Sequence, residues 1–264
     1  MPASGAEIGV IGGSGFYGLF EEADELEIET PYGGPSDLVT VGEVAGRRVA
    51  FVPRHGRTHA IPPHRINYRA NLWALRELGV VRLIIPCACG SLRAEIRRGD
   101  FVICDQLVDR TWGRPDTFYD GPATTHVSLA DPYCPQLRPL AVATAGHLGI
   151  PVRDRGTVLV TQGPRFSTRA ESRFYAQQGW DVINMTQYPE VPLARELEMC
   201  CVNISLVTDY DAGIEGVEAV TVQEVVQVLG ENNERLKSLL LELIPAIPAE
   251  RSCPCGTSLR AARL

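Results

Sequence analysis

Runs of apolar residues recur along the chain at the length of buried β-strands. Several of these runs are continuous rather than alternating, which is typical of strands covered on both faces of a sheet. The predicted strands cover residues 8–12, 48–53, 82–87, 100–109, 156–162, 181–185 and 201–209. A further run, LEIETP at 26–31, also indicates a strand.

Segments with apolar residues at helical spacing lie between these strands. The predicted helices cover residues 67–79, 136–149, 167–179, 190–199 and 221–244. Strands that alternate with helices indicate an α/β fold with a mostly parallel sheet surrounded by helices. No internal repeat or linker divides the 264 residues, so we expect one domain, 1–264, with its core at about 8–245. The pattern assigns no structure to the tail at 246–264.

The composition narrows the class of protein. The formal net charge of -7 argues against a nucleic-acid surface, so any anion must be bound by a local group of basic residues. No apolar run approaches the roughly 20 residues that span a bilayer, and the first residues show no signal-peptide pattern. We therefore expect a cytoplasmic protein without a membrane partner, whose eight cysteines are reduced thiols.

A glycine-rich turn follows the first predicted strand. Gly13, Gly15 and Gly18 satisfy the dinucleotide fingerprint G-x-G-x-x-G, but the next twenty residues leave no room for the helix and second strand that this fingerprint requires. Exposed backbone N–H groups beside the Ser14 hydroxyl suit a smaller anion. A plain turn at the end of a strand remains an alternative.

A basic segment spans residues 53–71. Its basic residues are Arg54, His55, Arg57, His59, His64, Arg65 and Arg69. Arg54 and His55 directly follow a predicted strand, where α/β sheets place ligand-binding residues. This position favours an oxyanion site with Arg54 as a bidentate donor. A solvated basic loop and a metal site at His55, His59 and His64 are the alternatives.

Two further strand ends carry polar residues. The segment 161–171 combines a Gly-Pro turn with a helix start, where Ser167 or Thr168 is available as a cap. Phe166 lies beside these polar groups, as expected for an aromatic ring that stacks on a planar base. The strand at 181–185 ends at the hydroxyl of Thr186.

Asp209 and Asp211 end the last predicted strand. Carboxylates at positions i and i+2 of a strand point to the same side, so each should raise the pKa of the other. A carboxyl group that holds a proton near neutral pH can act as a general acid. A solvated turn that ends at Gly213 is the alternative.

Nine segments, in order, carry a family resemblance. They are GVIGGSGF, TPYGGPSD, RHGRTHAIPPHRINYRAN, ACGSLR, RGDFVICDQLVDRT, RPDTFYDG, GPRFSTRAE, INMTQYPE and TDYDAG. Between about residues 8 and 245 the chain resembles the 5′-methylthioadenosine phosphorylases, within the trimeric purine nucleoside phosphorylase family. This resemblance implies a single-domain nucleoside phosphorylase fold, with a mostly parallel or mixed central sheet that is partly barrel-like.

The resemblance also implies a set of site residues. For phosphate they are Ser14, Arg54, His55, Cys87 and Thr186. For the nucleoside they are Ala88, Phe166, Ser167, Met185, Asp209 and Asp211, with His59, Val222, Val225 and Val226 around the methylthio group. His126 corresponds to a histidine that a neighbouring subunit lends to the site. Relatives usually carry Thr at the position of Cys87, and a thiol is the weaker donor, so we expect phosphate binding to depend less on this position.

The implied reaction is the phosphorolysis of 5′-methylthioadenosine in purine and methionine salvage. Asp209 would protonate N7 of adenine and Asp211 would bind its 6-amino group, with inorganic phosphate as a substrate and no metal or organic cofactor. The alternatives are a purine nucleoside phosphorylase acting on adenosine or on 6-oxopurine nucleosides such as methylthioinosine, a nucleoside-binding module, and a dehydrogenase. Likeness to the family implies a homotrimer. Some heat-loving relatives use the pair corresponding to Cys253 and Cys255 as a disulfide, whereas a reduced pair is expected in this chain.

Overall fold

A computed structural model gives the fold of the chain. It describes residues 5–13, 20, 22–214, 216, 218, 220–260 and 262. Ser14, Gly15 and Gly18 of the glycine-rich turn lie outside the described residues. Within the described part, no helix is both long enough and apolar enough to cross a membrane.

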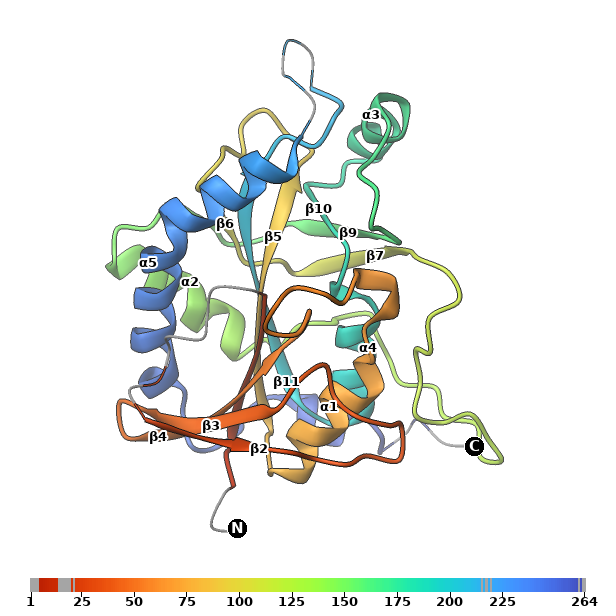
Figure 1. The fold of residues 1–264 in the computed structure, drawn as a ribbon, viewed down its shortest axis with the longest axis vertical. Helices are drawn as coiled ribbons and strands as arrows, with labels where there is room; N and C mark the ends of the chain where they lie inside the picture. The colour runs from red at the N-terminus through yellow and green to blue at the C-terminus, as the bar shows by residue number, and fades with distance from the viewer. Residues whose placement is uncertain are drawn as a thin grey trace.

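In the described part of the chain, eleven strands form one mixed sheet (Figure 1). In chain order they are β1 Ile8–Gly12, β2 Ala23–Leu26, β3 Val39–Val44, β4 Arg47–Pro53, β5 Arg82–Ser91, β6 Phe101–Val102, β7 Gln106–Arg110, β8 Val152–Arg153, β9 Thr157–Thr161, β10 Val182–Asn184 and β11 Cys200–Asp209. The main path runs β2-β3-β4-β1-β5-β10-β9-β7, and β11 joins it by pairing with β5. This path ends at β2 and β7, so the sheet is open, and the expected barrel-like part is not closed.

The central strand β5 pairs in parallel with both β1 and β11, and in antiparallel fashion with β10. All ten residues of β11 are buried, and in β5 only Ala88 is partly exposed. Continuous burial explains why these two strands are apolar on both faces. The long β5–β11 pair therefore forms the framework on which the site residues are placed.

Helices cover both faces of this framework. They are α1 Tyr68–Glu77, α2 Leu137–His147, α3 Arg169–Gln177, α4 Gln187–Glu196 and α5 Val222–Ala246, with 3-10 turns η1 Pro63–Arg65 and η2 Pro254–Thr257. The helices α2 and α5 pack together on one side, and α1 and α4 on the other (Figure 1). Each pair contributes to its own apolar cluster against the sheet.

The predicted elements agree with this fold in most places. The predicted strand at 100–109 is wrong as one unit, because the chain leaves β6 after Val102 and re-enters the sheet at Gln106 as β7. The strand expected at 26–31 ends at Leu26 instead, since β2 covers Ala23–Leu26. Sequence pattern missed β3 and the two-residue β8, and it missed the η2 turn in the tail.

Candidate active site

The candidate site follows the second half of β5. A nitrogen of the Arg54 guanidinium lies 3.4 Å from the carbonyl oxygen of Pro86, and Asp209 is the register partner of Gly90. Four residues of extended strand span about 13 Å. The basic residue and the acidic residue thus mark two ends of one line along β5.

Close approach at the acidic end requires glycine. A Cβ atom on Gly90 would lie 2.7 Å from Asp209 Oδ1 and 3.1 Å from the Ile183 side chain. Only a residue without a side chain leaves room for the carboxyl group there. Gly90 therefore lets β10 and the end of β11 converge on β5.

Arg54 is buried, with 1% of its surface exposed, and it forms an ion pair with the buried Glu190 of α4. Its Nε and Nη2 atoms donate to the two Glu190 oxygens, and Nη2 also donates to the Ile11 carbonyl at 2.9 Å. Although burial opposes the charge, Glu190 raises the pKa of Arg54. The bidentate partner of Arg54 is thus Glu190 and not an external anion. These contacts leave one N–H of Nη1 without an acceptor among the described residues.

His55 is neutral and oriented by the backbone. Its Nδ1 lies 2.8 Å from the carbonyl oxygen of Ile61, which fixes the proton on Nδ1 and leaves Nε2 as an acceptor. Burial and the neighbouring Arg54 lower the pKa of His55 to about 4. The His59 ring stacks on the His55 ring with centroids 4.3 Å apart. Among the described residues, no metal-ligand group includes the histidines at 55, 59 and 64.

The Cys87 sulfur is an acceptor near the Arg54 end of the line. The side-chain amides of Asn184 and Asn203 donate to it at 3.1 and 3.3 Å, and the Ser205 hydroxyl lies 3.5 Å away. The Asn184 oxygen in turn accepts from the backbone N–H of Thr186 at 3.3 Å. Cys87 therefore connects β5, β10 and β11, and it holds the start of α4 in place through Asn184.

Asp209 and Asp211 are 5% and 3% exposed. The expected strand geometry is wrong for Asp211, which lies past the end of β11 in a turn with a φ of 49°. The turn itself brings the two residues together, because the Asp211 backbone N–H donates to Asp209 Oδ1 at 2.7 Å. The Thr208 hydroxyl donates to Asp209 Oδ2 at 2.8 Å.

Burial raises the pKa of both carboxyl groups and is the largest cause for each. Repulsion from Asp211 adds a smaller increase for Asp209. The hydroxyls of Ser172 and Ser167 lower the pKa of Asp211 in part. Asp211 Oδ2 is buried and has no hydrogen-bond partner among the described residues. An unpartnered buried acceptor next to a carboxyl group with a raised pKa suits a ligand with adjacent donor and acceptor atoms.

The remaining candidate residues lie in β5, at the end of β10 and in the loop before α3. Ala88 is partly exposed between buried neighbours, and Met185 is partly exposed at the end of β10. Thr168 is the N-cap of α3 in a complete capping box, which leaves the Ser167 hydroxyl to face Asp211. Phe166 is 36% exposed in the loop before it.

Four candidate residues are not brought to this line within the chain. Val222 and Val226 are 62% and 63% exposed on the first turns of α5, with Val225 partly buried between them. His126 is exposed, and its backbone N–H donates to the Ala262 carbonyl near the end of the chain. The structure therefore gives His126 no contact with Asp209 or Arg54 of its own chain.

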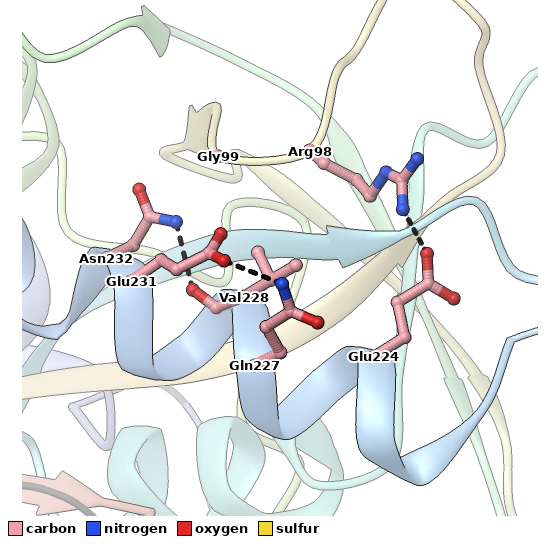
Figure 2. Close-up of a pocket in the computed structure, with 7 residues that line it drawn as sticks. All are labelled: Arg98, Gly99, Glu224, Gln227, Val228, Glu231 and Asn232. Carbon is pink, nitrogen blue, oxygen red and sulfur yellow. Dashed lines mark hydrogen bonds and ion pairs between the residues drawn. The ribbon is translucent and has the colours of Figure 1, made fainter.

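A cleft of about 210 Å³ lies between the first half of α5 and the Arg98–Gly99 segment (Figure 2). Its lining residues are Arg98, Gly99, Glu224, Gln227, Val228, Glu231 and Asn232. Arg98 and Glu224 form an ion pair across it, and Gln227 donates to Glu231 along the helix. The groups that face this cleft satisfy one another, and none of the candidate residues lines it.

Sequence reasoning missed several residues that support the site. Glu190 neutralises Arg54, Asn184 connects Cys87 to Thr186, and Ser172 faces Asp211. Arg114 donates to the backbone carbonyls of Met185 and Gln162, which fixes the two loops beside the site. A glutamate in the otherwise uncharged run YPEVPLA at 188–194 was the one signal in the sequence that could have indicated a buried partner for Arg54.

Comparison with known proteins defines the class. A profile of the Phosphorylase superfamily matches residues 7–245, and the chain belongs to this family. A relative from Thermofilum pendens named S-methyl-5′-thioadenosine phosphorylase is 55% identical over 255 residues, covering 96% of this chain and 97% of its own. One from Pyrococcus abyssi with the same name is also 55% identical, over 254 residues, with 96% and 98% covered. A Streptomyces coelicolor relative named purine nucleoside phosphorylase is 54% identical over 265 residues, with 96% and 94% covered.

Solved structures give the same fold. Methylthioadenosine phosphorylase from Schistosoma mansoni in complex with adenine has a TM-score of 0.92 and 34% identity, covering 98% of this chain and 99% of that one. A methylthioadenosine phosphorylase from an antarctic soil metagenomic library has a TM-score of 0.93 and 37% identity, with 99% and 93% covered. The mixed α/β architecture and the phosphorylase enzyme class predicted from the sequence are confirmed.

Proposed function

We propose that the protein cleaves 5′-methylthioadenosine with phosphate and releases adenine and 5-methylthioribose 1-phosphate. One observation carries the proposal: two buried carboxyl groups with raised pKa values, Asp209 and Asp211, lie at one end of the line along β5. The spare Arg54 N–H and the neutral His55 lie at the other end. The names of the relatives from Thermofilum pendens and Pyrococcus abyssi support the choice of substrate.

The phosphate end would hold and orient the nucleophile. Phosphate oxygens would accept hydrogen bonds from one N–H of Arg54 and from the hydroxyls of Thr186 and Ser14. Nε2 of His55 would accept a hydrogen bond from a phosphate oxygen that carries a proton. Glu190 keeps Arg54 buried and fixed, so the guanidinium acts as a positioned donor in a site from which water is excluded. Phosphate oxygen then forms a bond to C1′ of the ribose as the bond from C1′ to N9 breaks.

The purine end would neutralise the leaving group. Charge builds up on adenine as the glycosidic bond breaks, and Asp209 would donate its proton to N7. Thr208 and the Asp211 N–H hold the Asp209 carboxyl in place. The unpartnered Oδ2 of Asp211 would accept from the 6-amino group, so a 6-oxopurine would leave this buried acceptor unsatisfied.

The other parts of the proposal concern specificity and assembly. Val222 and Val226 expose apolar side chains that would contact the methylthio group, and such a pocket rejects a hydroxyl only by about a hundredfold. Adenosine is therefore expected to be a slower substrate. The exposed His126 would complete the site of a neighbouring subunit in a cytoplasmic homotrimer that serves purine and methionine salvage. No metal or organic cofactor enters this chemistry.

Product analysis tests the proposal directly. The purified protein is incubated with methylthioadenosine, adenosine or inosine, each with and without phosphate, and adenine or hypoxanthine release is measured. We expect phosphate-dependent adenine release that is fastest for methylthioadenosine. A purine nucleoside phosphorylase is the second candidate, since the Streptomyces coelicolor relative carries that name. Faster cleavage of inosine than of methylthioadenosine would select this second function.

A further inference from the structure

Four cysteines meet at the amino end of the β5–β11 pair, away from the site described above. The sulfur atoms of Cys134, Cys200, Cys253 and Cys255 all lie within 4.8 Å of one another. Three of these residues are buried and Cys253 is partly exposed. They come from the segment before α2, the first position of β11, and the η2 turn of the tail. We call this group the thiol cluster.

The dimensions of the thiol cluster match a tetrahedral metal site. Zinc binds thiolate sulfur at about 2.3 Å, which places the four sulfur atoms of a tetrahedron roughly 3.8 Å apart. The Cys200 and Cys253 sulfur atoms are 3.3 Å apart, and the other pairs stay within 4.8 Å, so shifts of about an ångström would close the shell. A polynuclear iron–sulfur cluster is too large for this space, because its own iron and sulfide atoms must fit between the thiolates.

The surroundings of the thiol cluster favour bound anionic sulfur. Arg82 is fully buried, and its Nη1 donates to the Cys200 sulfur at 3.4 Å. Four thiolates around a divalent ion carry two net negative charges, which a buried guanidinium offsets in part.

The thiol cluster also explains how the tail is held. The family profile ends at residue 245, and both Cys253 and Cys255 lie beyond it. Arg82 Nη2 donates to the carbonyls of Pro248 and Glu250, so the same arginine contacts the cluster and the tail. A metal bound to Cys134 and Cys200 of the core and to two tail cysteines would attach residues 248–260 to the sheet.

We propose that Cys134, Cys200, Cys253 and Cys255 bind one structural zinc ion that fastens the tail to the core. Binding converts four thiols to thiolates and releases their protons to solvent, and no sulfur atom is oxidised. The sequence predicted a chain without a metal, in which Cys253 and Cys255 are a reduced pair, and the proposed zinc site differs from both expectations. It is independent of the proposed function, because the four sulfur atoms lie at the opposite end of β5 from Gly90.

Metal analysis of the full-length protein tests this site. The chain is produced without a histidine tag, purified with reductant and without chelators, and its zinc content is measured by mass spectrometry. We expect about one zinc per chain. If the isolated protein contains disulfides, which lower its mass by two hydrogens each, it is reduced and offered Zn²⁺. Failure of the fully reduced protein to retain zinc would overturn the proposal.

Variants locate the metal. Cys253→Ser with Cys255→Ser should lose the zinc, whereas Cys201→Ser should retain it, because the Cys201 sulfur contacts the Pro132 carbonyl and lies outside the cluster. Cobalt substitution of the wild-type chain gives a readout that does not require the variant to fold. We expect the intense visible bands of tetrahedral cobalt with sulfur-to-metal charge transfer. Zinc retained by the folded double variant, or a cobalt spectrum of an octahedral oxygen site, would contradict the assignment.

Discussion

The two ends of the β5–β11 pair are built for different tasks. At the amino end Arg82 is the register partner of Cys200, and its guanidinium is engaged by the tail, Gln136 and the Cys200 sulfur. At the carboxyl end Gly90 pairs with Asp209, and Asp211 Oδ2 has no partner among the described residues. The buried polar groups of one end hold the core and the tail together, whereas the other end has a carboxylate oxygen without a partner among the described residues.

The two ends of the candidate site also differ in whether their buried charged groups have an ion partner. Arg54 has a buried counter-ion in Glu190, whereas Asp209 and Asp211 have hydroxyl and backbone donors but no cationic partner among the described residues. The paired arginine keeps its charge, and the unpaired carboxyl groups are shifted toward the protonated form. Burial disfavours the charged form of all three side chains. Arg54 stays charged because it has an ion partner, and the carboxyl groups shift toward the protonated form because they have none.

The largest expected effect comes from breaking the buried ion pair. Glu190→Ala leaves Arg54 buried and uncompensated, which should lower the free energy of unfolding by about 3–5 kcal/mol. Urea unfolding followed by circular dichroism measures the change. Arg155→Ala removes an exposed ion pair with Asp154 and should change stability by less than about 1 kcal/mol. Equal losses in both variants would show that the Arg54–Glu190 pair has no special role.

His55 should make stability depend on pH. Its folded-state pKa of about 4 lies below the ordinary value of 6.5, so between these values the unfolded chain binds more protons. The free energy of unfolding should therefore fall as the pH drops from 6.5 to 4, by up to about 3 kcal/mol. His55→Asn, which keeps a donor for the Ile61 carbonyl, should remove this part of the slope. An unchanged slope in that variant would mean that His55 is not the group responsible.

Replacing the proposed acid tests the other end of the site. Asp209→Asn cannot donate the acidic proton, so kcat/KM for methylthioadenosine should fall by about a hundredfold and the preference should shift toward inosine. Because the proposed acid must carry a proton, the wild-type rate should decline as the pH rises through the raised pKa of Asp209. The variant should lack this decline. The exposed Asp24 on β2 supplies the control, and Asp24→Asn should leave both rates unchanged. Full activity in Asp209→Asn would remove Asp209 from the mechanism.

The smallest expected effect concerns the helix next to Asp211. Thr168→Ala removes the N-cap of α3 and half of its capping box, which should lower stability by about 1 kcal/mol. Since α3 carries Ser172, the KM for nucleoside should rise while kcat changes little. Thr168→Ser keeps the cap and serves as the control. If Thr168→Ser lost as much stability as Thr168→Ala, the missing methyl group would explain the effect instead of the missing cap.

Local sequence information determined most of the elements. Continuous apolar runs placed β1, β4, β5 and β11 to within a few residues, because strands buried on both faces leave a clear signal. The local pattern failed where strand pairing decides the structure. β7 pairs with β9, and nothing in the sequence of residues 100–109 marks the interruption between β6 and β7. Helix starts were accurate where a cap was present, as at Thr168 and Thr221.

The sequence by itself determined the fold class, the strand ends that carry polar residues, and the family. Only the tertiary structure decided which groups are paired: that Glu190 takes the bidentate contacts of Arg54, and that Cys134 and Cys200 meet two cysteines of the tail. The physical reason is that periodicity reports the burial of one segment at a time. Partners more than fifty residues apart are chosen by the packing of the whole sheet, which no local pattern records.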